Sequence, residues 1–75
     1  MTAKKRHATK LIEQVASNIK YYRTKKRMSQ EKLQEETGLA IFRYESGRQD
    51  MTLTTIDVLA RHLDIDPYEL LKWFY

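Results

Sequence analysis

Residues 28–48 read MSQEKLQEETGLAIFRYESGR, and this stretch decides the fold. Ser29 is a residue type that caps helix N-termini, and Glu31 in the next turn favours the positive end of a helix. Gly38 can adopt a positive φ, which ends that helix. A second break at Ser46-Gly47 closes the following segment. The stretch therefore predicts two short helices joined by a turn at Gly38.

Upstream of this stretch, the sequence predicts one longer helix that follows a basic arm. From Lys10 onward, apolar residues recur at helical spacing; they are Leu11, Ile12, Val15, Ala16, Ile19 and Tyr22. Thr9 is the candidate N-cap, and the cations of residues 25–27 suit the negative end of the helix dipole. Residues 1–9 lack this pattern, so we expect them to form a flexible basic arm.

Downstream, two more helices are expected, which makes five helices and no strand. Thr52 can cap the first of them, and Asp66 followed by Pro67 is a strong start for the second. The inner face of the first is predicted to hold Leu53, Ile56, Leu59, Ala60 and Leu63. The second is predicted to carry Leu70, Leu71, Trp73, Phe74 and Tyr75. Residues 10–75 are thus predicted to form one compact all-α domain, a five-helix bundle.

The length and composition of the chain restrict its class. The 75 residues allow one domain, and 41% of them are hydrophobic, enough for a small core. The chain has no cysteine, so neither a disulfide nor a thiolate zinc site can stabilise that core. No apolar run approaches the ~20 residues that span a bilayer. We therefore expect a soluble cytoplasmic protein with no membrane contact.

Charge is distributed unevenly along the chain. The net charge is +4, yet residues 1–27 hold nine Lys or Arg and a single acid, whereas residues 28–75 hold five Lys or Arg and nine acids. Such a polarised molecule suits a polyanion bound on one face, which favours nucleic acid as a partner. The alternative is a basic tail that only improves solubility.

No catalytic or metal-binding constellation can be assembled from this sequence. The chain has two histidines, His7 in the arm and His62 on a predicted helix. The group His62, Asp64 and Asp66 has ligand-type atoms, but its alternating spacing straddles a helix end, which favours a solvated helix terminus over a metal site. No glycine-rich phosphate loop is present. We expect no enzyme activity, no cofactor and no small-molecule ligand.

The two short helices and the turn between them have the layout of a helix-turn-helix, whose second helix enters the major groove of DNA. Four segments resemble the lambda-repressor-like (Cro/XRE-type) DNA-binding family: MSQEKL at 28–33, TGL at 37–39, IFRYESGR at 41–48 and LTTI at 53–56. The resemblance extends from about Ile12 to Leu71. It implies a five-helix all-α fold and double-stranded DNA as the partner.

The resemblance also implies roles for individual residues. Gln30 matches an amide that contacts phosphate and braces the recognition helix, and Arg43 matches a groove-facing position from which it can read guanine. Arg23 and Glu45 match a buried ion pair, the alternative being two independent surface charges. Core positions are matched by Leu33, Leu39, Ile41 and Tyr44, and a phosphate-gripping turn by Ser46, Gly47 and Arg48. The residues expected at the DNA are Ser29, Gln30, Ala40, Phe42, Arg43, Ser46 and Arg48.

Two basic clusters have open interpretations. Lys26 and Arg27 lie just before the first of the two short helices, either near the expected path of the DNA backbone or only as a solvated helix cap. Lys5 and Arg6 lie in the arm, where they either follow phosphates and a minor groove or add only non-specific attraction.

The chain departs from the family pattern at the start of the recognition helix. About three residues that usually stand between Ala40 and Ile41 are missing. Because a helix turns by ~100° per residue, losing three residues nearly restores the phase, so the core positions persist while the tip that reads bases is shortened. Phe42 is then either a contact for a thymine methyl group or a half-buried packing residue.

The aromatic C-terminus indicates an assembly. The apolar side chains of Leu70, Trp73, Phe74 and Tyr75 either fold back on the first helix or form a two-fold homodimer, and the resemblance implies dimers on palindromic sites. The sequence therefore predicts a homodimeric, sequence-specific transcription regulator in the nucleoid, such as a restriction–modification controller or a phage-type repressor. The alternative is a protein-interaction module such as an antitoxin, whose C-terminus binds a partner protein.

Overall fold

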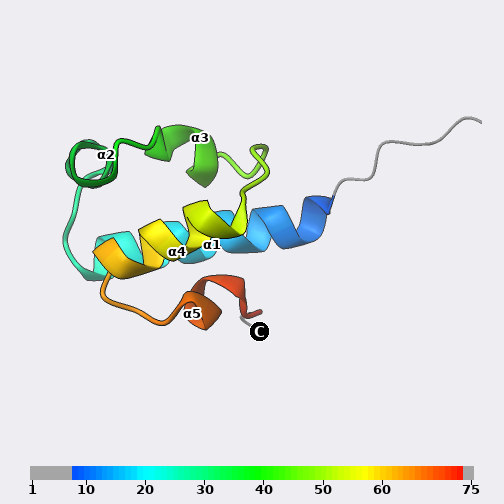
Figure 1. Cartoon of the computed structure of the whole chain (residues 1–75). Coiled ribbons are helices and arrows are strands. Elements are labelled where there is room, and N and C mark those ends of the chain that lie inside the picture. Colours follow the sequence, from blue (N-terminus) through cyan, green and yellow to red (C-terminus); the bar gives the residue numbers. More distant parts are fainter. Residues whose placement is uncertain (1–7, 74–75) are drawn as a thin grey trace, which may run out of the picture.

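A computed structural model describes residues 8–73 and leaves residues 1–7 and 74–75 undescribed. The five helices are α1 (Thr9–Lys25), α2 (Gln30–Thr37), α3 (Ile41–Glu45), α4 (Leu53–His62) and α5 (Pro67–Leu71). Over residues 8–73 there is no strand. The helices α2 and α3 lie on one side of α1 and α4, and α5 lies on the other (Figure 1). The prediction of an all-α five-helix bundle is confirmed, while the predictions for Lys5, Arg6, Phe74 and Tyr75 lie outside the described residues.

Local side-chain caps start three of the helices where the sequence predicts them. The Ser29 hydroxyl accepts a hydrogen bond from the Lys32 amide (3.0 Å). In the same way Thr52 caps α4 and Asp66 caps α5, with Pro67 as the first helical residue. The prediction for α1 is wrong, because Ala8 occupies its N-cap position without a side-chain bond and Thr9 is already helical.

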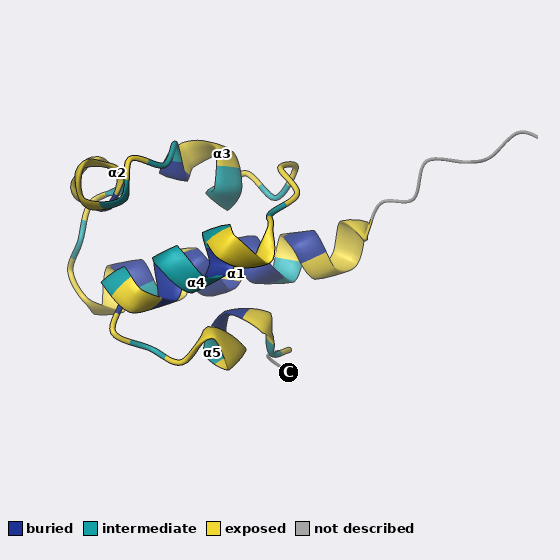
Figure 2. Cartoon of the chain, viewed as in Figure 1, coloured by how far each residue is buried: buried dark blue, intermediate teal, exposed yellow. Residues whose placement is uncertain are grey.

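The apolar faces of all five helices meet in one core (Figure 2). Its buried members are Val15, Ile19, Leu33, Ile41, Ile56, Leu59, Ala60, Leu63 and Leu70. Leu53, predicted on the inner face of α4, is instead 79% exposed. Side chains tilt toward the helix N-terminus, so the side chain of the first helical residue points past the end of α4 rather than onto the core. Leu11 in the first turn of α1 is likewise exposed.

The end of α5 differs from the prediction in two respects. The helix stops at Leu71, so Trp73 lies beyond it instead of on it. Leu70, expected at a dimer interface, has no exposed surface and belongs to the core of its own chain. The reason is that α5 packs against α1 and α4, and Leu70 lies in the core that these helices share. The prediction of Leu70 as an interface residue is therefore corrected.

A buried asparagine that the sequence analysis missed holds α5 against α1. Asn18 is fully buried, and its Nδ2 donates to the carbonyl oxygens of Leu70 (2.9 Å) and Lys72 (2.8 Å). Its Oδ1 accepts a hydrogen bond from Gln14 Nε2 (2.8 Å). A buried amide with all these partners satisfies carbonyls that the end of α5 leaves without helical partners.

Two carboxylates have lowered pKa values, so the stability of the folded chain depends on pH in the acid range. Lys72 and Tyr22 hydrogen-bond to Glu69 and lower its pKa below the ordinary 4.5, and Lys26 lowers the pKa of Asp64 below the ordinary 3.8. A carboxylate whose pKa is lower in the folded state stabilises fully above its unfolded pKa and loses that contribution as the pH falls through its folded pKa.

We therefore expect the free energy of unfolding to decrease as the pH falls below 4.5. The variants Glu69→Gln and Asp64→Asn should each show a shallower decrease, because the group that titrates is gone. Urea denaturation at a series of pH values between neutral and strongly acidic measures this. An undiminished acid dependence in both variants would contradict the assignment.

Candidate nucleic-acid interface

The turn between α2 and α3 is built around Gly38. This residue ends α2 in the left-handed conformation (φ 74°), and its amide bonds to the Gln34 carbonyl at 2.7 Å. Thr37 Oγ1 donates to the Leu33 carbonyl and accepts from the Leu39 amide. These two hydrogen bonds fix the backbone at Gly38 and Leu39. The helix α3 then starts at Ile41 beside α2 (Figure 1).

A second left-handed glycine ends the segment where it passes close to α1. Gly47 has φ 79°, and a Cβ placed on it would lie 3.4 Å from Cγ of Glu13 in α1. Beside it, Ser46 Oγ donates to the Arg43 carbonyl (2.6 Å) and accepts from the Arg48 amide (3.2 Å). The Ser46 hydroxyl therefore orders the turn, while the Arg48 side chain remains exposed.

An ion pair fixes α3 to α1. Arg23 Nε and Nη2 donate to the two carboxylate oxygens of Glu45 at 2.6 and 2.9 Å, a bidentate geometry. The side chains of Arg23 and Glu45 are only 9% and 3% exposed, so this is the buried pair that the resemblance implies and not two surface charges. The hydrogen bond to Glu45 raises the pKa of Arg23 above its ordinary value.

The same pair also reaches the start of α2. Arg23 Nη1 donates to the Met28 carbonyl (2.7 Å), and Gln30 Nε2 donates to Glu45 Oε1 (2.9 Å). Gln30 is the first residue of α2, so its side chain connects that end of the helix to α3. The bracing role expected of Gln30 is therefore visible in the structure. We define the bracing network as Arg23, Met28, Gln30 and Glu45.

The outward surface of α3 is small. Ile41 is fully buried, Tyr44 packs partly against the core, and Glu45 belongs to the bracing network. Phe42 is 57% exposed and Arg43 is exposed, with its guanidinium 5.9 Å from the centre of the Phe42 ring. The helix has five residues, so the shortening seen in the sequence is a short α3. Ala40 precedes it as a half-buried N-cap without a side-chain bond.

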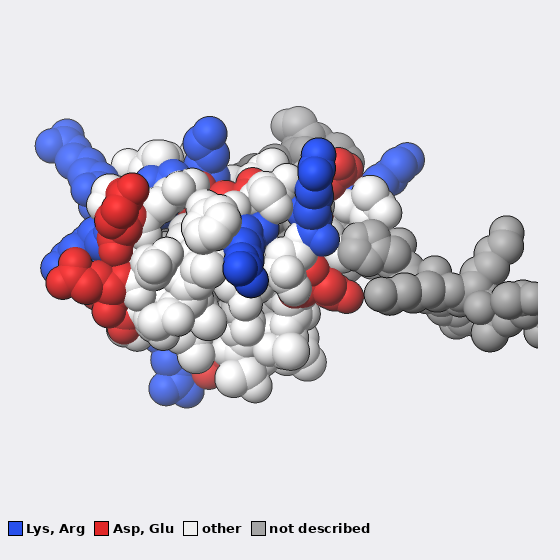
Figure 3. All heavy atoms as spheres, turned by 90° about the horizontal axis from the view of Figure 1, so that it is seen from above, with Lys and Arg blue, Asp and Glu red and all other residues white. Residues whose placement is uncertain are grey.

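Several arginines on or near this surface carry no compensating carboxylate. Within the described part of the chain, Arg27, Arg43 and Arg48 form no ion pair. By contrast, Arg61 on α4 pairs with Asp57 at 3.1 Å. Viewed onto α2 and α3, the acidic side chains gather mainly where α2 lies, and Lys and Arg side chains project at several points (Figure 3). Unpaired arginines are the groups that can neutralise phosphates.

Lys26 does not belong to this set. Its Nζ bonds to Asp64 Oδ2 (2.5 Å) and to the His62 carbonyl (3.0 Å), so it holds the end of α1 to the end of α4. This bridge between two helices is not the solvated cap of α1 that was the alternative to a phosphate contact. We therefore remove Lys26 from the predicted phosphate contacts.

The acidic and histidine side chains near the end of α4 have separate partners. His62 Nδ1 lies 3.3 Å from Glu36 Oε1, Asp64 pairs with Lys26, and Asp66 caps α5. Among residues 8–73, no group of three His, Cys, Asp or Glu side chains is placed to hold a metal ion. None of the helices in this range is both long and apolar enough to cross a membrane.

A short helix, a glycine turn and a second helix braced from α1 together define a helix-turn-helix protein. Residues 19–70 match the sequence profile of the helix-turn-helix family of the Cro/C1 type, and the chain belongs to this family of DNA-binding transcription regulators. A solved structure titled a hypothetical transcription factor, NHTF, from Neisseria is similar. It is 28% identical, has a TM-score of 0.80 and matches over 96% of this chain and 86% of that one. No curated protein matches this chain.

Proposed function

We propose that this chain is a sequence-specific transcription regulator that binds a palindromic DNA operator as a homodimer, with α3 in the major groove. The observation that carries the proposal is the bracing network, which locks α3 in place so that Phe42 and Arg43 project outward. A rigid element with two free side chains is suited to reading base edges. The family match and the Neisseria structure support the coarser part of the proposal, a DNA-binding transcription regulator.

Within this proposal the remaining polar groups position the protein on the duplex. Gln30 and the start of α2, capped by Ser29, approach one phosphate, and the turn at Ser46 and Arg48 approaches another. Arg27 adds a further unpaired cation before α2. These contacts carry affinity and little sequence information.

Selection of bound duplexes from a random pool tests the proposal directly. We expect one enriched sequence with two-fold symmetry and half-sites about 34 Å apart, one turn of B-DNA. The affinity should fall with salt, with a log–log slope of about −0.9 per phosphate neutralised. Failure to enrich any sequence, or an affinity that ignores salt, would refute it.

Replacing Gln30 by alanine should weaken binding to every duplex by a similar factor. The variant loses a phosphate contact worth about 1 kcal/mol per protomer and one hydrogen bond to Glu45. The bidentate pair of Arg23 with Glu45 remains and keeps α3, with its base-reading side chains, in place. Titration against the selected operator and against random DNA measures both losses. Gln34→Ala is the matched control, because Gln34 is an exposed amide of the same helix. A changed sequence preference in Gln30→Ala would contradict the phosphate role.

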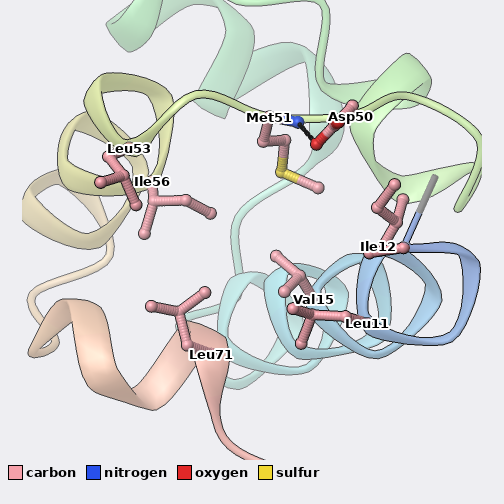
Figure 4. A pocket seen from close by; sticks show the side chains of 9 residues that line it. Leu11, Ile12, Val15, Asp50, Met51, Leu53, Ile56 and Leu71 are labelled. Atoms are coloured by element: carbon pink, nitrogen blue, oxygen red, sulfur yellow. Dashed lines mark hydrogen bonds between the residues drawn. The ribbon is translucent and has the colours of Figure 1, made fainter. Parts of the chain in front are cut away.

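The dimer surface that we propose lies where α1, α4 and α5 leave apolar side chains exposed. Leu11 is 38% exposed, Leu53 79% and Leu71 37%, and all three line a pocket of about 160 Å³ (Figure 4). Trp73, 46% exposed, follows Leu71 after one residue. Apolar surface of this kind is typical of a protein contact, and a two-fold copy would cover it on both subunits at once.

The variant Leu53→Glu should convert the proposed dimer into monomers, because it places a charge in the apolar contact. Sedimentation equilibrium over a range of concentrations measures the shift. Tyr68→Glu is the control, since Tyr68 is 66% exposed but does not line the pocket. A wild type that stays monomeric, or a Leu53→Glu variant that dimerises normally, would remove the dimer from the proposal.

The exposed apolar surface also supports a second candidate, a module whose Trp73 binds a different protein. In that case a heterologous protein co-purifies in fixed stoichiometry. This protein no longer co-purifies with Trp73→Ala, while the DNA affinity of that variant remains unchanged. If the chain purifies as an oligomer of itself and no other protein co-purifies with it, the homodimer is favoured.

A further inference from the structure

The most unusual side chain on α3 is Phe42, an aromatic ring that is 57% exposed on a helix of five residues. Phe42 is not among the apolar side chains that pack against the core of the described residues, which favours a contact role over a packing role. The guanidinium of Arg43 lies 5.9 Å from the centre of this ring.

The shortness of α3 limits what it can read. Successive residues of a helix are ~100° apart, so Ile41, Tyr44 and Glu45 point inward together while residues 42 and 43 point outward. The burial of Ile41 and the pairing of Glu45 agree with this arrangement. The helix therefore offers two side chains to base edges, one apolar and aromatic, the other a guanidinium.

Each of these side chains matches one chemical feature of the major groove. The C5-methyl group of thymine is the apolar group on a base edge there, and an aromatic ring can pack against it. The O6 and N7 atoms of guanine accept two hydrogen bonds from an arginine. The Arg43 guanidinium lies 5.9 Å from the centre of the Phe42 ring, so the two side chains can reach features on neighbouring base pairs.

We infer that α3 reads one two-base-pair step in each half-site, with Phe42 packed on a pyrimidine C5-methyl group and Arg43 bonded to the adjacent guanine. The inference rests on the proposed function and deepens it, since it names the chemical groups that the site recognises. A 5-methylcytosine carries its methyl group at the same ring position as thymine, so Phe42 accepts it as well.

Base analogues test this inference without altering the duplex elsewhere. Thymines of the selected operator are replaced one at a time by uracil, which removes only the methyl group. At one position in each half-site, affinity should fall about fourfold, the effect of one buried methyl group, and about 15-fold when both half-sites are changed. Cytosine at that position should bind weakly, and 5-methylcytosine should recover affinity relative to cytosine.

Protein variants assign the effect to the two side chains. Phe42→Ala should bind the thymine and uracil operators equally, and Phe42→Leu should retain part of the difference. In Arg43→Ala, the preference for guanine over other bases at the neighbouring pair should fall by a factor of roughly 5 to 150. Tyr68→Ala is the control, because it removes an exposed ring from α5. Circular dichroism establishes that each variant folds.

The outcomes separate this inference from the function on which it rests. The inference is wrong, and the DNA-binding function stands, if the wild type binds its operator but every uracil substitution leaves the affinity unchanged. The same holds if Phe42→Ala still prefers the thymine operator over the uracil operator as strongly as the wild type does. If the wild type binds no duplex above background, the proposed function fails and the inference fails with it.

Discussion

Replacing Glu45 by alanine is expected to lower the free energy of unfolding by about 3–5 kcal/mol, because it leaves the Arg23 guanidinium buried without a counter-charge. Proteins of this length have a stability of about 4–11 kcal/mol, scaled from the usual value per residue. The loss therefore removes much of the stability of the fold, and DNA affinity should fall with the folded fraction. Urea denaturation at neutral pH measures the effect.

Two further variants show that burial and pairing cause this loss. The double variant Arg23→Met/Glu45→Leu should be more stable than Glu45→Ala, because apolar residues can replace a buried pair at little cost. The control is Asp57→Ala, which breaks an exposed pair with Arg61 and should cost only ~0–1 kcal/mol. An equal, small loss in Glu45→Ala and Asp57→Ala would show that the buried pair does not stabilise the fold.

The second large effect is expected for Asn18→Leu, which keeps the size of the side chain but removes its amide. The carbonyls of Leu70 and Lys72 lose their donor, and each unsatisfied carbonyl costs about 1–3 kcal/mol where it is buried. We expect a total loss of about 2–4 kcal/mol and faster hydrogen exchange throughout α5, whose end is no longer held against α1.

Gln14→Ala is the matched variant for this prediction. It removes the hydrogen bond that Asn18 accepts, on a partly exposed side chain, and leaves both carbonyl contacts in place. It should therefore cost about 1 kcal/mol or less. If Asn18→Leu were as stable as the wild type, the Asn18 amide would not be what holds α5 against α1.

Much of the candidate site was predictable because the relevant signals are local or specific to a family. The cap at Ser29, the left-handed turn at Gly38 and the short α3 follow from residues close together in the sequence. The pairing of Arg23 with Glu45 came from the resemblance, since nothing in the spacing of two charges places them in contact.

The errors concern residues whose environment depends on distant segments. Asn18 interrupts the apolar face of α1, and a polar residue within such a face was the signal that could have marked a buried hydrogen-bond network. Leu53 and Leu70 look alike in the sequence, yet one is exposed at the start of α4 and the other is fully buried. Lys26 pairs with Asp64, which is 38 residues away in the sequence.

The sequence by itself determined where α2, α4 and α5 begin and where α2 ends, because a cap or a glycine turn acts between residues two to four positions apart. Only the tertiary structure decided which side chains meet across the chain: Glu45 with Arg23, Leu70 with Asn18, and Asp64 with Lys26. Those contacts depend on how the helices pack, and helical periodicity defines a face without saying which element covers it.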